Sequence, residues 1–243
     1  MTPVKKMAAR FLDFIYPAAC HLCHRPLKYG RHLCTACSES LHYIEPPFCS
    51  RCGEAFDGAI GGEFVCPNCH ELKLHFDFAR AALHSDDNGR KMVHDLKYGR
   101  QIHLADSLAS LAATALDDPR FSTYLETGML VPVPLHWMRQ RKRRFNQSEE
   151  IARCLAKLTR LPAVNALRRD RNTETQTRFS RKKRLKNLTN AFSAKPRHHP
   201  QINGSHIILV DDVFTTGSTA NECAKTLKSA GAKAVSVLTV LRG

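Results

Sequence analysis

The sequence predicts an α/β protein with a parallel sheet, preceded by a small cysteine-rich module. Apolar segments of strand length alternate with helical patterns after residue 73, which is typical of a parallel sheet. Two adjacent carboxylates and a hydroxyl-rich turn follow one apolar segment near the end of the sequence. Eight of the ten cysteines form four CxxC pairs between positions 20 and 69. We therefore expect two domains, residues 1–72 and residues 73–243.

The cysteine pairs have the spacing of zinc knuckles. A CxxC turn presents two thiolates, and zinc binds four ligands in a tetrahedron. The simplest interpretation is two successive ribbons, in which neighbouring pairs share an ion. A crossed pairing, first with third and second with fourth, stays open. Both sites would be structural, because four thiolates leave no open coordination position. The predicted zinc ligands are Cys20, Cys23, Cys34, Cys37, Cys49, Cys52, Cys66 and Cys69.

A disulfide framework is the alternative for eight cysteines in a secreted protein. The start of the sequence argues against secretion, because the apolar run after Arg10 is short and Asp13 interrupts it. We expect a cytoplasmic protein that begins with a short amphipathic helix. No stretch reaches the length of about 18 apolar residues that predicts a membrane span.

The first half of the larger domain reads as strand, helix, helix, strand. The run at 76–84 is apolar and short enough for a strand, and the helical pattern at 89–99 ends at a glycine. Leucine and alanine recur with amphipathic spacing over 104–116, which predicts a second helix. The segment 129–134 predicts a short buried strand.

The second half continues the alternation. A helix is predicted at 146–160, because Asn146 is a favourable N-cap and two glutamates occupy the first turn. A short strand is predicted near 163–165, and a polar loop at 196–204. The final unit is predicted as a strand at 207–210, a helix at 220–230 and a strand at 234–241.

The turn after the strand at 207–210 has the composition of a phosphate cradle. Backbone N–H groups point outward at a helix N-terminus, where the helix dipole favours an anion. Asp211 and Asp212 can accept hydrogen bonds from sugar hydroxyls, so the local chemistry suits a ribose 5-phosphate. Glycine at 217 fits a positive φ or close approach to phosphate. The expected phosphate-binding residues are Thr215, Thr216, Gly217, Ser218 and Thr219.

Three basic segments fit such a site. The net charge of the chain is +15, which favours anionic partners such as nucleic acids or phosphorylated metabolites. Cations cluster in the segments 97–100, 131–152 and 171–192. Each segment is also compatible with a solvated surface. Their presence beside a ribose-phosphate cradle is notable, because a diphosphate leaving group needs cations near its developing charge.

Taken together, these motifs resemble the ComF (ComFC/GntX-like) family. The resemblance covers nearly the whole chain: the paired cysteines, LKYGR, VPVP followed by RFNQ, the Gln176–Asn187 pattern and VDDVFTTGST. It implies a type I phosphoribosyltransferase fold behind a double zinc ribbon. It also implies binding of phosphoribosyl diphosphate (PRPP) together with Mg²⁺, which would neutralise charge on the diphosphate.

The resemblance also implies roles for two loops. Residues 132–146 would contact diphosphate, and residues 171–187 would close over the site. The side chains expected to make these contacts are Arg143, Arg171, Gln176 and Arg184. The family usually has a glycine where this chain has Arg144. If that glycine lets backbone N–H groups approach the diphosphate closely, its replacement by Arg144 would weaken or abolish transferase activity.

Three functions follow as hypotheses. The first is a phosphoribosyltransferase, and the second is a single-stranded DNA-binding protein in a pathway of DNA uptake or utilisation, with DNA-uptake proteins as partners. The third is a PRPP or nucleotide sensor without turnover. We favour a PRPP-binding domain that acts in the use of external DNA. No pattern in the sequence names the acceptor or the oligomeric state.

Overall fold

The computed structural model describes residues 19–27, 32–58, 60–70, 72–171 and 188–243. The larger domain surrounds a four-stranded parallel sheet with the order β1-β6-β5-β2. Its strands are β1 (Ala79–His84), β2 (Met129–Pro132), β5 (His206–Phe214) and β6 (Ala234–Arg242). The expected parallel α/β architecture is therefore confirmed. No helix among the described residues is long and apolar enough to cross a membrane.

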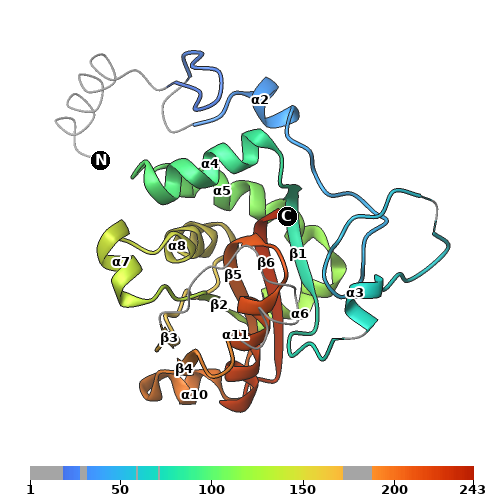
Figure 1. Cartoon of the computed structure of the whole chain (residues 1–243), viewed down its shortest axis with the longest axis vertical. Helices are drawn as coiled ribbons and strands as arrows, with labels where there is room; N and C mark the ends of the chain where they lie inside the picture. Colours follow the sequence, from blue (N-terminus) through green and yellow to red (C-terminus); the bar gives the residue numbers. More distant parts are fainter. Residues whose placement is uncertain (1–18, 28–31, 59, 71, 172–187) are drawn as a thin grey trace.

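Each face of the sheet packs against its own hydrophobic core. Alternate residues of β5 point to opposite faces, so Ile208 and Val210 join one core while Ile207 and Leu209 join the other. Helices α4 (Asp87–Tyr98), α5 (Leu104–Ala113) and α8 (Gln147–Thr159) cover the first face, and α11 (Ser218–Ser229) covers the second (Figure 1). This layering places the carboxyl ends of the central strands beside the ends of α4, α8 and α11.

Capping residues explain where the main helices begin. Asp86 accepts a hydrogen bond from the N–H of Gly89 at 2.7 Å and starts α4, and Gly99 ends that helix. Asn146 accepts from the N–H of Ser148 and starts α8, as its N-cap preference predicts. The remaining short elements are α2 (Thr35–Glu39), α3 (Pro67–His70), η1 (Thr114–Asp117), η2 (Pro119–Phe121), α6 (Ser122–Thr127), α7 (Trp137–Arg143), β3 (Leu167–Arg169), β4 (Phe192–Ala194), η3 (Pro196–His198) and α10 (His199–Ile202).

Several expected elements differ from the structure. The strand predicted near 163–165 is a single bridge between Ala163 and Leu130. The segment predicted as a polar loop at 196–204 contains η3 and α10, because a proline at a first helical position favours a helical turn. The strand predicted at 207–210 extends through both carboxylates to Phe214. The amphipathic helix expected at the start of the chain lies outside the described residues.

The cysteine-rich segment covers the outer edge of the sheet. Ile44 donates its backbone N–H to Ala82 at 2.9 Å, and His84 donates to His42 at 2.8 Å. Further along, Ala79 donates to Arg51 at 2.9 Å. These bonds satisfy backbone groups that an edge strand otherwise exposes. In Figure 1, this segment runs from α2 to α3 along the side of the domain that carries β1.

Candidate functional site

The turn after β5 and the first two residues of α11, together residues 215–219, are hereafter the cradle loop. Gly217 adopts φ +73° and is the N-cap of α11. A Cβ atom at this position would lie 2.5 Å from the ring of Phe214, so both backbone conformation and packing require glycine. The hydroxyls of Thr216 and Ser218 lie 2.9 Å apart. A small pocket of about 50 Å³ opens over this loop.

The acid pair, Asp211 and Asp212, precedes the cradle loop at the end of β5, and Asp211 lines the same small pocket. Ser148 at the start of α8 donates its hydroxyl to Asp211 Oδ1 at 2.8 Å. Lys97 in the last turn of α4 pairs with Asp212 Oδ1 at 2.9 Å. Asp212 is only 4% exposed, and its second oxygen, Oδ2, has no hydrogen-bond partner among the described residues. A buried carboxylate oxygen without a partner is costly unless a ligand satisfies it.

The two carboxylates are close enough to influence each other's charge. Burial, followed by repulsion from Asp212, raises the pKa of Asp211 to about 7, against the opposing effects of Ser148 and Lys97. A raised pKa produced by burial and a like charge is typical of functional sites. A cation or a hydroxyl donor near such a carboxylate would stabilise its charged form and lower its pKa.

Sequence reasoning missed the roles of Lys97 and Ser148. Lys97 belongs to a basic cluster that the sequence does reveal, and Ser148 follows the Asn146 cap. The contact of Ser148 with Asp211 spans 63 positions, so no local pattern connects the two residues. The sheet topology brings them together because α4 and α8 pack on the same face.

Arg143 lies at the rim of this site. Its guanidinium donates to Gln147 Oε1 at 3.1 Å and to the Tyr98 hydroxyl at 2.9 Å. Those two residues are the immediate neighbours of Ser148 and Lys97. Arg143 therefore bonds to both helices that contact the acid pair, α4 and α8.

The segment expected to form a diphosphate loop is partly helical. Residues Trp137–Arg143 form α7, and Arg144 ends it with φ +68° while donating its N–H to Gln140 at 2.6 Å. The basic pattern of this segment did not indicate a helix before Asn146, so α7 is a finding of the structure. A glycine at position 144 has a conformational reason, because the left-handed region favours glycine.

The other predicted loop residues contribute less to the described site. Arg171 is exposed and donates to the Thr189 carbonyl at 3.0 Å, rather than to the acid pair. Gln176 and Arg184 lie outside the described residues. Their expected contacts stay predictions.

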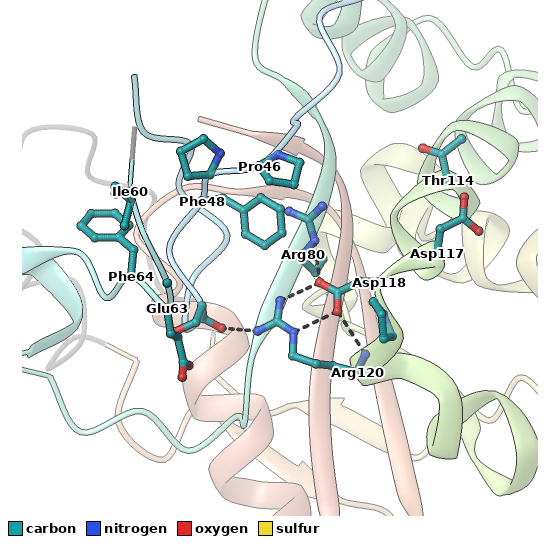
Figure 2. A pocket seen from close by; sticks show the side chains of 14 residues that line it. Pro46, Phe48, Ile60, Glu63, Phe64, Arg80, Thr114, Asp117, Asp118 and Arg120 are labelled. Atoms are coloured by element: carbon teal, nitrogen blue, oxygen red, sulfur yellow. Dashed lines mark hydrogen bonds and ion pairs between the residues drawn. The ribbon is translucent and has the colours of Figure 1, made fainter. Parts of the chain in front are cut away.

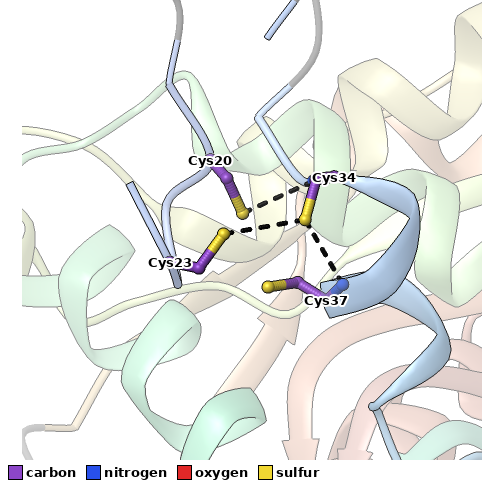
Figure 3. Close-up of side chains that lie close together, drawn as sticks. All are labelled: Cys20, Cys23, Cys34 and Cys37. Carbon is purple, nitrogen blue, oxygen red and sulfur yellow. Dashed lines mark hydrogen bonds between the residues drawn. The ribbon is translucent and has the colours of Figure 1, made fainter. Parts of the chain in front are cut away.

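The eight module cysteines form two tetrads of successive pairs. In each tetrad the four sulfur atoms lie within 4.8 Å of one another. Cys23 and Cys34 are 3.7 Å apart in the first tetrad, and Cys52 and Cys66 are 3.6 Å apart in the second. Zinc–sulfur bonds of about 2.3 Å in a tetrahedron require sulfur separations of roughly 3.8 Å. The tetrads therefore fit structural zinc, and they exclude the crossed pairing. Figure 3 shows the first tetrad.

The tetrads differ in exposure. All four sulfur-bearing residues of the second tetrad are buried, whereas Cys23 is exposed and Cys37 is half-buried in the first. The second tetrad also belongs to the hydrophobic core on the α11 face of the sheet. The first instead lies near α4, where His21 contacts Asp95 at 2.9 Å.

A second, larger pocket of about 590 Å³ lies where the module meets the domain. Arg80 and Arg120 converge there on Asp118, and the guanidinium of Arg80 lies 3.6 Å from the ring centre of Phe48 (Figure 2). Arg120 also donates to the carbonyl of Ser50. We call Arg80, Asp118 and Arg120 the arginine clasp. It joins the second ribbon to β1 and η2.

Comparison with known proteins agrees with this geometry. Residues 11–70 match the model of the double zinc ribbon domain, and residues 119–243 match that of the phosphoribosyl transferase domain. The chain is 31% identical to the DNA utilization protein YhgH of Escherichia coli (strain K12), over 93% of this chain and 97% of that protein.

Two competence proteins are similar over most of their length. Competence protein F of Haemophilus influenzae is 30% identical, with 84% of this chain and 88% of that protein covered. Competence protein ComFC of Bacillus subtilis is 25% identical, with 89% and 86% covered. Each match covers more than four-fifths of both proteins.

Proposed function

Because this chain belongs to the phosphoribosyl transferase domain family, in the group that includes DNA utilization protein YhgH and competence protein F, we propose that its site binds PRPP. The observation that carries the proposal is the unpartnered, buried Oδ2 of Asp212 beside the cradle loop. A ribose hydroxyl donating to this oxygen would remove the cost of burying it alone.

The geometry supports specific roles for the surrounding residues. Asp211 and Asp212 would accept hydrogen bonds from the 2- and 3-hydroxyls of ribose, and the cradle loop would bind the 5-phosphate at the N-terminus of α11. Arg143 would face the diphosphate from the rim. Carboxylate oxygens of this pair fit a hard cation, and Mg²⁺ bound with the diphosphate would neutralise its charge.

The reaction class that follows is displacement of diphosphate from C1 of the ribose. The bond from C1 to the diphosphate oxygen breaks, diphosphate leaves with the electron pair, and a nucleophilic atom of the acceptor bonds to C1. Residues of this chain would position the sugar and stabilise charge without forming a covalent intermediate. We place this activity in competence or DNA utilisation. We also propose a cytoplasmic location, because thiol ligands persist where thiols stay reduced.

Isothermal calorimetry with PRPP, with and without Mg²⁺, tests the binding. We expect saturable binding that weakens at least about tenfold in Asp212→Asn, a loss of about 1.4 kcal/mol. Glu126→Gln is the control, because Glu126 is an exposed acid on α6. Absence of heat at millimolar PRPP in both conditions would refute the proposal. Release of diphosphate with a nucleobase panel then separates a transferase from a sensor.

A second function, binding of single-stranded DNA, is favoured by one surface feature. Trp137 is 56% exposed on α7, and Arg141 lies over its ring at 5.0 Å. Lys142 and Arg143 continue the basic end of this helix. An exposed aromatic ring beside cations is the arrangement on which unpaired bases stack.

The fluorescence of Trp137 provides a direct test, because it is the only tryptophan in the sequence. We expect a single-stranded oligonucleotide to quench this fluorescence, with an affinity that falls steeply as salt rises. Trp137→Ala should weaken binding measured by anisotropy, whereas Leu158→Ala, another exposed apolar change, should not. Unchanged fluorescence at low salt would contradict this function.

A further inference from the structure

Arg242 at the end of β6 lies between the cradle loop and the second zinc ribbon. It is 9% exposed and pairs in register with Phe214 at the end of β5. On the loop side, its Nη1 donates to the carbonyls of Phe214 at 3.2 Å and Thr215 at 3.0 Å. The guanidinium also lies 5.2 Å from the ring centre of Phe214, the ring against which Gly217 is packed.

The other edge of the same guanidinium faces the ribbon. Nη2 contacts the carboxylate of Glu54 and lies 4.0 Å from Cys52 Sγ. Cys52 is a member of the second tetrad, and the N–H of Cys49, another member, donates to the Glu54 carbonyl at 2.7 Å. One side chain thus joins a predicted zinc ligand and its neighbour to the first residue of the cradle loop.

The ribbon side of this connection is firmly anchored. Gly53 has φ +66°, and a Cβ atom there would lie 2.7 Å from the Ala79 carbonyl oxygen. Arg51 accepts the N–H of Ala79 at 2.9 Å. The knuckle between Cys49 and Cys52 is therefore in close contact with the start of β1. A tetrad that binds zinc would hold the ribbon partners of Arg242 in fixed positions.

Because Arg242 is buried, its guanidinium needs hydrogen-bond partners within the protein. A charged guanidinium removed from water is stable only when its N–H groups find partners, and only arginine has a planar fork that reaches acceptors on two sides. The Nε of Arg242 has no partner among the described residues, so the side chain depends on its Nη1 and Nη2 contacts. Loss of the partners on one side would release the constraint on the other.

We propose that Arg242 is a positioning residue through which the zinc-bound second ribbon fixes the cradle loop in its ligand-binding conformation. The consequence for PRPP affinity rests on the proposed function. The link between the second ribbon and the cradle loop does not rest on that function, because it concerns the conformation of the loop without ligand. Zinc in this ribbon is then a structural determinant of the phosphate site, although no tetrad cysteine lines the pocket over the cradle loop.

Hydrogen–deuterium exchange of the ligand-free protein tests the link at residues 213–221. We expect Arg242→Lys and Cys69→Ser to raise exchange there by about fivefold, because local opening becomes easier. Arg80→Lys and Cys23→Ser are the matched controls: Arg80 is another buried arginine that meets the second ribbon, and Cys23 belongs to the first tetrad. The controls should leave exchange in this segment unchanged.

Glu54→Gln is a milder variant, because Glu54 is 43% exposed in its side chain and its loss should not prevent folding. We expect a rise of about twofold at residues 213–221. Equal exchange in the Arg242, Glu54 and control variants, despite lower unfolding temperatures, would overturn the proposal and leave a purely structural role.

Calorimetry with PRPP on the same variants separates the two proposals. Raised exchange in Arg242→Lys, with no PRPP binding by the wild-type protein, would uphold the link and refute the proposed function. Normal PRPP binding in Arg242→Lys and Glu54→Gln, with unchanged exchange, would refute the link and uphold the function. If both proposals hold, we expect PRPP affinity to fall about tenfold in Arg242→Lys and to stay unchanged in Arg80→Lys.

Discussion

At the scale of single residues, the acid pair divides its interactions between two helices. Asp211 accepts from Ser148 of α8, and Asp212 pairs with Lys97 of α4. Only one oxygen of Asp212 is occupied in this way. Two adjacent acids of the same chemistry therefore have different environments. The pKa of Asp211 is raised by burial and by its neighbour, whereas one oxygen of Asp212 is buried without a hydrogen-bond partner among the described residues.

The raised pKa of Asp211 predicts a pH-dependent stability. Its folded-state pKa of about 7 lies above 3.8, the ordinary pKa of an aspartate, so the folded protein binds this proton more tightly than the unfolded chain. Stability from this group is present below about pH 4 and is lost as pH rises to about 7, by roughly 2–4 kcal/mol. Asp211→Asn removes this pH-dependent loss. The free energy of unfolding of the variant, measured in urea, should therefore rise relative to that of the wild type between pH 4 and pH 7. A constant difference between pH 4 and 8 would contradict the assignment.

Gly217 and Gly204 provide a matched pair for the cradle loop. Both have φ near +73°, but a Cβ at Gly217 meets Phe214 at 2.5 Å whereas nothing lies within 4 Å of one at Gly204. Gly204→Ala should cost about 1 kcal/mol of unfolding free energy from backbone strain alone. Gly217→Ala should cost about 2–4 kcal/mol because of the added clash. Chemical denaturation measures both, and equal losses would show that the ring moves freely.

Much of the candidate site could be predicted from the sequence at this scale. The two acids and the glycine of the turn are visible because they are contiguous and because burying a strand does not require them. Lys97 and Ser148 could not be placed, because their contacts depend on how α4 and α8 pack. Arg242 carries no local signal at all, since its partners are distant in the sequence.

At the scale of elements, α7 changes the interpretation of the basic segment. Arg144 ends this helix in a left-handed conformation, which a residue with a side chain adopts at a cost. A glycine at position 144 would adopt this conformation without that cost. Arg160, which ends α8 at φ +63°, shows that the chain uses arginine twice in this way.

This interpretation predicts that Arg144→Gly stabilises the protein. The gain should be about 1 kcal/mol, because the left-handed conformation no longer strains a side chain. Arg160→Gly should give a similar gain and serves as the control, with thermal unfolding as the measurement. PRPP affinity should be equal in both variants. A selective increase in affinity in Arg144→Gly would instead assign the glycine a role at the diphosphate.

The predicted elements failed where the local pattern was short. Long helices and apolar strands were placed correctly, because their periodicity extends over many residues. Leu130 makes two backbone hydrogen bonds in this region: its N–H donates to the Pro162 carbonyl, and its carbonyl accepts from the N–H of Val164. The segment at 163–165 is too short to continue as a strand. The polar composition around Pro196 predicts a loop, although a proline also favours the start of a helical turn. The domain boundary at residue 72 stays a prediction.

At the scale of the whole molecule, the arginine clasp joins the module to the domain. Burial raises the pKa of Asp118, but hydrogen bonds from Arg120 and the charges of Arg120 and Arg80 outweigh this effect, so the pKa lies below the ordinary value of an aspartate. Burial also lowers the pKa of Arg80 to about 10. The clasp therefore keeps charges of both signs together between the second ribbon and β1.

Removing the charge of Asp118 should strongly destabilise this junction. Asp118→Asn leaves the guanidinium of Arg80 buried without its counter-ion, and we expect a loss of about 3–5 kcal/mol in unfolding free energy. Asp117→Asn is the control, because Asp117 is the exposed neighbour. Guanidinium unfolding measures both variants. If the two substitutions cost the same small amount, the junction does not depend on the clasp.

The unequal exposure of the two tetrads has a consequence for chemical damage. Alkylating reagents and oxidants attack thiolates that solvent can reach, and Cys23 is accessible while every cysteine of the second tetrad is buried. Oxidative stress should therefore release metal from the ribbon beside α4 first and spare the one beside Arg242. A cell could lose half of the bound zinc from this protein while the pocket over the cradle loop kept its shape.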